Sequence, residues 1–279
     1  MGQAIRATIL VENTAHKQDL LAEHGLAFWI ETGQTRVLFD TGQGNVLLHN
    51  ASRLGVELEL ADAVVLSHGH YDHTGGLAGV LRLASRAKVY THPAALRPKY
   101  ARDTDGAVRS IGISSDSESA ARDVAKELIW TKGPVEIARG LFATGEIPRV
   151  TDFEDTGGAF FLDEECQQPD PLIDDQAVFC ESPSGSVVFL GCAHAGVINT
   201  LRHIRQLTSG RPVHTVVGGM HLVGAGPRRM DRTVAELRRL GVRRLAPAHC
   251  TGPAATARLW SEFPARCVPS HVGTAMEVC

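Results

Sequence analysis

Apolar and polar positions alternate along the first part of the chain with the two-residue period of β-strands, and then change to the wider spacing of helices. Three runs rich in β-branched and aromatic residues, ATILVEN, GLAFWIET and TRVLFDTG, are bounded by turn formers, which predicts consecutive antiparallel strands over residues 7–13, 25–32 and 35–42. Helical spacing follows at 45–56, with Gly55 as a stop. A short apolar strand at 63–67, a helix at 77–84 and a strand at 87–92 are expected next.

The pattern weakens between residues 93 and 134. Charged, Ser-rich and Gly-containing stretches such as RPKYARDTDG and SSDSESAARD dominate there, without a sustained period. A segment this long without obvious structure inside a compact chain is more often a functional lid or insertion than a linker between domains. We therefore expect a lid or insertion at about 93–134.

The second half of the chain repeats the order of the first half. Strand-like alternation covers 135–145, 157–163 and 176–191, the last as a hairpin around Pro183. Asp231 and Gly241 are the expected N-cap and C-cap of one later helix. Since both halves run from antiparallel strands into alternating strand and helix, we predict a single α/β domain over 1–279, a four-layer αββα sandwich with two mixed sheets and outer helices. The remaining elements are expected at 196–207 (helix), 213–222 (strand), 231–241 (helix), 243–250 (strand) and 254–263 (helix).

The bulk composition is that of a globular protein without a strongly charged surface. Of the 279 residues, 43% are hydrophobic and 21% are charged, and the net charge is -3. This balance argues against a protein that coats nucleic acid or an anionic membrane. The six cysteines include no CxxC pair, and no apolar run approaches the roughly 18 residues of a membrane span. We expect a cytoplasmic protein whose oligomeric state the sequence leaves open.

Four side chains of the metal-ligand type lie within six positions directly after the apolar run AVVL: His68, His70, Asp72 and His73. If the strand stays extended to its end, His68 and His70 point to the same face and can share one ion. Asp72 and His73, at the start of the next helix, can then serve a second position. Imidazole and carboxylate groups suit zinc, iron or manganese. The alternative is a solvated histidine-rich turn, but four such groups after a buried strand favour a metal site.

Three more histidines, His194, His221 and His249, each follow an apolar strand. Ligands in open α/β sheets gather beyond the carboxyl ends of the strands. Each of these histidines alone would more often be a hydrogen-bonded structural residue. Their recurrence at three strand ends favours metal ligation.

The segment HGHYDHTGG at 68–76 matches the HxHxDH signature of the metallo-β-lactamase superfamily, and FDTG at 39–42 matches the strand-end aspartate that often precedes it. Almost the whole chain resembles one branch, the proteins similar to 7,8-dihydropterin-6-yl-methyl-4-(β-D-ribofuranosyl)aminobenzene 5'-phosphate synthase. The segments that match this branch are THPAALRPKY, ATGEIPR, DDQAVF, GCAHAGVINT, GGMHL and PAHCTG. The resemblance implies the metallo-β-lactamase fold and a metal-dependent hydrolase, or a transferase like that synthase.

The resemblance also implies a dinuclear site for two divalent ions, zinc in the first place, with manganese and iron as alternatives. Asp40 would be a group that orients a metal ligand. By this resemblance, one ion is held by His68, His70 and His194, and the other is held by Asp72, His73 and His249.

Two positions depart from the commonest superfamily pattern. Gly191 is followed by Cys192, where a bridging aspartate is usual, and ATGEIPR lacks the histidine often found in that part of the chain. Cys192 could supply a thiolate, or it could be a small buried residue without a metal role. Glu146 could approach the site as a ligand or an acid, or it could be a surface carboxylate.

The chemistry expected of such a site is hydrolysis or a related transfer. A hydroxide held by the two ions would be the nucleophile, and the ions would stabilise the charge that develops on the substrate. Asp72 could steer the proton, and His221 could contact an oxyanion or protonate a leaving group, unless it is only a packed strand-end residue. A small phosphorylated or pterin-like substrate is expected. Its phosphate could be bound by Lys99, Tyr100, Arg109 or Arg149, which are otherwise solvated surface groups.

Two other functions compete with this hypothesis. A nuclease would need a basic channel, for which the composition offers little. A non-catalytic ligand sensor or redox protein could keep the same fold and its metal. Turnover of a substrate by the metal-loaded protein would distinguish the enzyme from the sensor.

Overall fold

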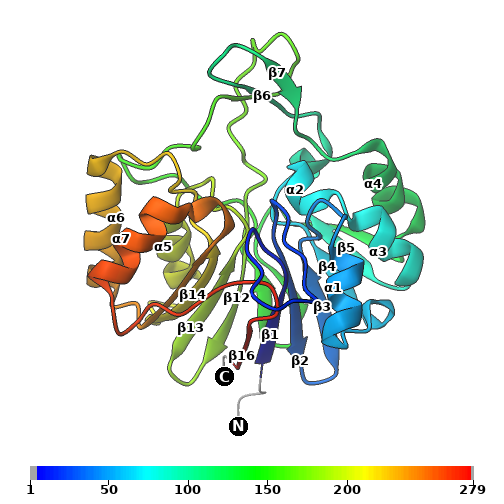
Figure 1. The fold of residues 1–279 in the computed structure, drawn as a ribbon, viewed down its shortest axis with the longest axis horizontal. Helices are drawn as coiled ribbons and strands as arrows, with labels where there is room; N and C mark the ends of the chain where they lie inside the picture. The colour runs from blue at the N-terminus through cyan, green and yellow to red at the C-terminus, as the bar shows by residue number, and fades with distance from the viewer. Residues whose placement is uncertain (1–4, 278–279) are drawn as a thin grey trace.

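The computed structural model describes residues 5–277 and arranges them in four layers, with two β-sheets face to face and helices on both outer faces (Figure 1). The predicted αββα sandwich is confirmed. The first sheet contains the three antiparallel strands expected near the N-terminus, and a parallel part follows them. Its seven strands, in order across the sheet, are β16 (Ala275–Glu277), β1 (Ile5–Val11), β2 (Ala27–Thr32), β3 (Thr35–Phe39), β4 (Ala63–Val65), β5 (Lys88–Thr91) and β8 (Glu127–Trp130).

The second sheet has the same mixed character. An antiparallel hairpin, β12 with β13, turns at Pro183 and Ser184 as expected, and two parallel strands then extend the sheet from β13. Its six strands, in order, are β15 (Arg244–Ala248), β14 (Val213–Gly219), β13 (Gly185–Leu190), β12 (Ala177–Ser182), β10 (Leu141–Ala143) and β9 (Val135–Ala138).

Apolar side chains fill the space between the sheets and the space beneath each helical layer. Between the sheets, the Phe28 ring stacks on Phe39 at 6.1 Å and meets the edge of Phe189 at 5.8 Å between ring centroids. Burying each such ring stabilises the fold by roughly 1.5–3 kcal/mol. The outer layers are formed by α1 (Leu47–Leu54), α3 (Leu77–Leu83) and α4 (Ser115–Ser119) on the first sheet, and by α5 (Val197–Leu207), α6 (Pro227–Leu240) and α7 (Pro253–Glu262) on the second.

Helix boundaries follow the sequence signals except at α6. Gly55 and Gly241 end α1 and α6 in the left-handed conformation, with φ of 67° and 72°. The prediction of Asp231 as an N-cap is wrong, because α6 begins one turn earlier, at Pro227, after Gly226. Proline is well suited to the first helical position, where its missing N–H has no partner to lose. Within residues 5–277, no helix has the length and apolar character needed to cross a membrane.

The segment 93–134 is more regular than expected. β6 (Tyr100–Arg102) pairs with both β7 (Val108–Ser110) and β11 (Phe160–Phe161) in a small third sheet that stands above the sandwich (Figure 1). The expectation of a wholly irregular insertion is corrected by β8, which pairs with β5 at the edge of the first sheet. No residue of β8 is fully buried, and this exposure explains its weak sequence pattern. The role of the small sheet as a lid stays a prediction.

The parallel strands of both sheets end at the edge below this small sheet, whereas β1 begins and β16 ends at the opposite edge (Figure 1). Side chains that follow β3, β4, β13, β14 and β15 therefore gather in one place. The helix α2 (Tyr71–Thr74) begins there too, after the loop 66–70 that follows β4.

Candidate metal centre

The rings of His68, His70 and His194 converge at this edge, with centroids 4.5, 4.8 and 4.9 Å apart. Over the part of the chain that the structure describes, the Nε2 atoms of all three are buried and have no hydrogen-bond partner. Unpaired buried polar atoms destabilise a protein by about 1–3 kcal/mol each. Three of them on neighbouring rings fit a shared acceptor of nitrogen lone pairs, and a divalent metal ion is such an acceptor.

Hydrogen bonds to the other ring nitrogen place a lone pair on Nε2. Nδ1 of His194 lies 2.8 Å from the carbonyl oxygen of Thr156, so it must donate its proton. Nδ1 of His68 lies 2.9 Å from Oγ of Ser67, whose own proton is donated to Asp40 at 2.7 Å. Ser67 therefore accepts from the His68 ring. A neutral imidazole that carries its proton on Nδ1 offers Nε2 to a metal.

Burial keeps this set uncharged. It lowers the pKa of His68 and His194 well below the usual value, and it lowers the pKa of His70 to about 3. All three rings are thus neutral near pH 7. Metal ligation requires this state of a histidine.

A second group of ligand atoms lies beside the first. Nε2 of His73 lies 3.3 Å from Nε2 of His249, and Oδ2 of Asp72 lies 3.7 and 3.3 Å from these two nitrogens. The opposite ring nitrogens are again occupied, since Nδ1 of His73 donates to Asp40 at 2.7 Å and Nδ1 of His249 donates to Asn13 at 2.9 Å. Two nitrogen lone pairs 3.3 Å apart, with a carboxylate beside them, fit a cation.

The electrostatics of this second set favour positive charge. Burial alone would lower the pKa of His73, but the carboxylates of Asp40 and Asp72 raise it to about 9. Burial alone would raise the pKa of Asp72, but His73, His24 and His249 hold it well below its usual range. The Asp72 carboxylate is therefore ionised near pH 7. The His73 ring is protonated when no metal ion is bound.

Cys192 lies between the two sets. Its Sγ is 3.2 Å from Nε2 of His73, and it forms groups of ligand atoms within 4.8 Å of one another both with His68 and His194 and with His73 and His249. A thiolate at this point can ligate ions in either set. The metal role that the sequence left open for Cys192 stays a prediction, which this position permits.

Three supporting residues escaped the sequence reasoning. Glu12 accepts the backbone N–H of His249 at 2.7 Å, Asn13 fixes the ring of His249, and Nε2 of His24 lies 3.2 Å from Asp72. A signal for two of them exists, because the polar pair Glu12 and Asn13 directly follows the apolar strand β1. His24 lies in a loop and carries no such signal.

The DDQAVF segment, residues 174–179, is hydrogen-bonded to the two loops that carry the candidate ligands, one around Gly69 and one around Ala195. Asp174 accepts the backbone N–H of Gly69 at 2.8 Å, and Asp175 accepts that of Ala195 at 2.8 Å. Burial raises the pKa of Asp175 to about 7. The Lys99 ammonium, which is completely buried, donates to Asp174 at 3.0 Å and to Asp170 at 2.6 Å. Lys99 therefore secures the loops and is not accessible to a phosphate.

Three other residues expected to bind substrate or act as an acid, Arg149, Glu146 and Tyr100, do not border the cavity. Arg149 donates to the carbonyl oxygen of His194 at 2.6 Å, and Glu146 lies 3.0 Å from Nε2 of His92 with its side chain half exposed. Neither borders the cavity over the metal ligands. Tyr100 precedes Ala101, which does border it, so the Tyr100 side chain points to the opposite face of β6.

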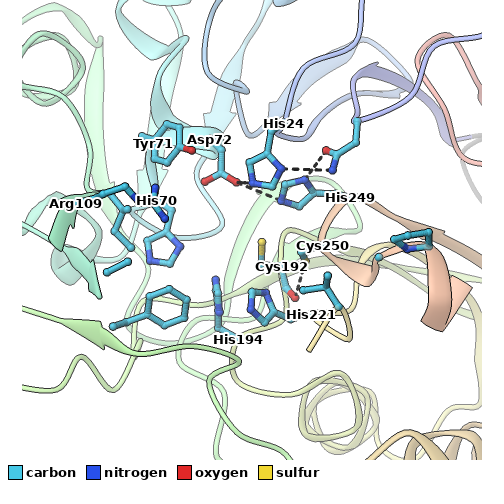
Figure 2. Close-up of a pocket in the computed structure, with 17 residues that line it drawn as sticks. His24, His70, Tyr71, Asp72, Arg109, Cys192, His194, His221, His249 and Cys250 are labelled. Atoms are coloured by element: carbon cyan, nitrogen blue, oxygen red, sulfur yellow. Dashed lines mark hydrogen bonds and ion pairs between the residues drawn. The ribbon is translucent and has the colours of Figure 1, made fainter. Parts of the chain in front are cut away.

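The cavity above both sets has a volume of about 420 Å³ (Figure 2). Its floor includes His70, His194 and His249, and its wall includes the aromatic ring of Phe160. Arg109 lies at one side, where its guanidinium makes two contacts with Asp103, at 2.6 and 2.9 Å.

His221 lies beside the ligands without belonging to either set. Its ring centroid is 4.2 Å from that of His194, and its Nε2 lies 3.3 Å from the carbonyl oxygen of Gly157. The cavity reaches this ring. The catalytic role expected for His221 stays a prediction.

Comparison with known proteins places this arrangement in a family. The family model described as the metallo-beta-lactamase superfamily matches residues 21–249. The chain belongs to the metallo-β-lactamase superfamily. The predicted family and its fold are thereby confirmed. The candidate ligand groups, His68, His73 and His194 among them, lie within the matched region, and superfamily members bind metal ions.

Individual members of the superfamily are similar over nearly the whole chain. A Methanocaldococcus jannaschii protein named 7,8-dihydropterin-6-methyl-4-(beta-D-ribofuranosyl)-aminobenzene-5'-phosphate synthase is 26% identical, over 92% of this chain and 90% of its own. An uncharacterized protein of the same organism is 33% identical, over 90% and 92%. The solved structure of Tm1679, described as a metal-dependent hydrolase of the beta-lactamase superfamily, is 29% identical with a TM-score of 0.83, over 98% and 99%.

Replacing Lys99 tests its role beneath the metal loops. Lys99→Met leaves Asp170 and Asp174 buried without their cation, so the free energy of unfolding should fall by about 3–5 kcal/mol in urea titrations. The matched control is Lys88→Met, whose partially exposed pair with Glu127 should contribute less than about 1 kcal/mol. Equal effects of the two substitutions would contradict this role.

Replacing Asn13 tests whether its hydrogen bond orients His249 as a ligand. Asn13→Ala should weaken zinc binding by about 10–100-fold, because loss of the partner of a ligating histidine releases its ring orientation. Competition with a chromophoric chelator measures this change. The control is Asn45→Ala, because the Asn45 residue is exposed. Unchanged zinc affinity in Asn13→Ala would show that His249 is not held for a metal.

Proposed function

We propose that this protein is a dinuclear metal-dependent hydrolase or related transferase for a small phosphorylated or pterin-like substrate. One observation carries the proposal: within the described part of the chain, three neighbouring neutral histidines have buried Nε2 atoms without a hydrogen-bond partner, and two of them, His70 and His194, border the cavity. The second set beside it supports a two-ion site. Divalent ions bound there would supply Lewis acidity and lower the pKa of water towards neutrality.

Asp72 is the candidate general base at the cavity. Nε2 of His24 lies 3.2 Å from Oδ2 of Asp72, and this contact orients the carboxylate. Asp72 is ionised and borders the cavity, so it can accept a proton from a nucleophile above it. A base that is held by a neighbour keeps the geometry that proton transfer needs.

His221 is the candidate for contact with the leaving group or an oxyanion. The Gly157 carbonyl can only accept, so Nε2 of His221 carries a proton and donates it there. Among the described residues, Nδ1 has no partner. Gly157 is required for this approach, because a Cβ atom there would lie only 1.8 Å from the His221 ring.

The side chains on the upper wall of the cavity are suited to a flat, negatively charged substrate. Ala101 pairs with Phe160 on one side and with Arg109 on the other, so these three side chains share one face of the small third sheet. An aromatic ring and a guanidinium on this face suit a planar ring system and a phosphate. The 26% identical relative carries both dihydropterin and phosphate in its name.

A screen of the metal-loaded protein against phosphoesters, lactones and thioesters tests the proposed activity. The double variant His68→Ala, His73→Ala should lose turnover, since it removes one histidine from each ligand set. His214→Ala, which affects a histidine bonded to its neighbour Thr215, should keep it. If the double variant and the ion-free protein match the metal-loaded protein, the enzyme proposal fails. Tight metabolite binding without turnover would instead support the sensor alternative.

Arg109 provides a second test, of substrate choice. Arg109→Gln should raise KM for a phosphorylated substrate about tenfold and leave kcat nearly unchanged, because a rim cation contributes to binding in ground state and transition state alike. Steady-state kinetics measures both constants, and KM for an unphosphorylated ester should not change. Arg122→Gln, in an exposed pair with Glu118, is the control. A loss confined to kcat would contradict this assignment.

A further inference from the structure

A third group of ligand atoms lies on the other side of Cys192. Sγ of Cys192, Sγ of Cys250 and a ring nitrogen of His221 all lie within 4.8 Å of one another. All three residues border the cavity, and Figure 2 shows them side by side. No role in the expected two-ion site involves Cys250.

The backbone is built to bring these two thiols together. Cys192 follows β13 and Cys250 follows β15, and β14 lies between these strands. Gly219 ends β14 at this point, and a Cβ atom there would lie 2.6 Å from Sγ of Cys250 and 3.3 Å from the Cα of Cys192. The absence of a side chain at Gly219 therefore lets the thiols meet across the middle strand.

Backbone strain also concentrates around this group. Ala193, His221 and His249 have positive φ values of 56°, 45° and 49°, which L-residues adopt at a cost of about 1–3 kcal/mol each. Ala193 directly follows Cys192, and His249 directly precedes Cys250. His221 supplies the imidazole of the group. Within the described residues, Nδ1 of His221 is buried without a hydrogen-bond partner, which is a second indication that a ligand belongs there.

We propose that Cys192, Cys250 and His221 form a third metal position, selective for a thiophilic ion such as Cd²⁺, Cu⁺ or Zn²⁺. Two sulfurs and one nitrogen form a soft ligand set, whereas the other two sets consist mainly of imidazole and carboxylate. Binding releases the protons of the ligating thiols to solvent. Because Cys192 belongs to all three groups, an ion here draws its sulfur away from the histidine sets. The proposal does not depend on turnover of any substrate.

X-ray absorption of the ion-free full-length protein with one equivalent of Cd²⁺ tests this site directly. A soft ion should enter the thiolate position first, so two sulfur ligands per cadmium are expected. One sulfur would mean that Cys192 serves a histidine set alone, and none would mean that the ion sits among imidazoles. Either result would overturn the proposal, and the measurement needs no variant.

Substitution of Cys250 adds a matched test. Cys250→Ser should lower the sulfur count from two to one and reduce the thiolate-to-cadmium absorption by roughly half, since that absorption scales with the number of thiolates. Cys267→Ala, at a buried cysteine packed beneath the helices of the second sheet, should change neither value. Circular dichroism verifies the fold of both variants. An unchanged sulfur count in folded Cys250→Ser would contradict the proposal, independently of any enzyme activity.

Discussion

The buried carboxylate of Asp40 is the interaction on which both histidine sets depend. It accepts three hydrogen bonds, from the N–H and Oγ of Ser67 and from Nδ1 of His73, all between 2.6 and 2.7 Å. Directly at His73, and through Ser67 at His68, it fixes which ring nitrogen carries the proton. The sheets must meet tightly to allow this: a Cβ atom at Gly191 would lie 2.1 Å from the Ser67 hydroxyl. The close packing of the two sheets therefore also sets the orientation of the histidine rings.

The same edge carries several strained backbone positions. Asp40, Ala193, His221 and His249 have positive φ values although none is glycine. Each follows the end of a strand, and the residues after Ala193 and His249, which are His194 and Cys250, border the cavity. The well-packed apolar layers between and outside the sheets supply the stability that such positions require. The sandwich carries the two histidine sets, and the small third sheet, with Arg109 on it, forms the wall above them.

Features that depend on residues close together in the chain could be predicted from the sequence. Strand periods and turn formers indicated the sandwich, and the HxHxDH segment with the strand-end histidines indicated the ligand sets. The supporting contacts were beyond reach because they join distant residues: His249 and Asn13 are 236 positions apart, and Gly69 and Asp174 are 105 apart. Lys99 shows the same limit. Its polar neighbourhood suggests a surface residue, and only the tertiary approach of two aspartates makes its burial favourable.

Anomalous diffraction at the zinc edge, from crystals of the zinc-loaded protein, directly tests whether the two histidine-rich sets bind metal ions. One peak is expected about 2.0–2.1 Å from the Nε2 atoms of His68, His70 and His194, and a second peak at the same distance from the Nε2 atoms of His73 and His249. Crystals of zinc-saturated protein with no peak beside these nitrogens would contradict metal binding by these sets.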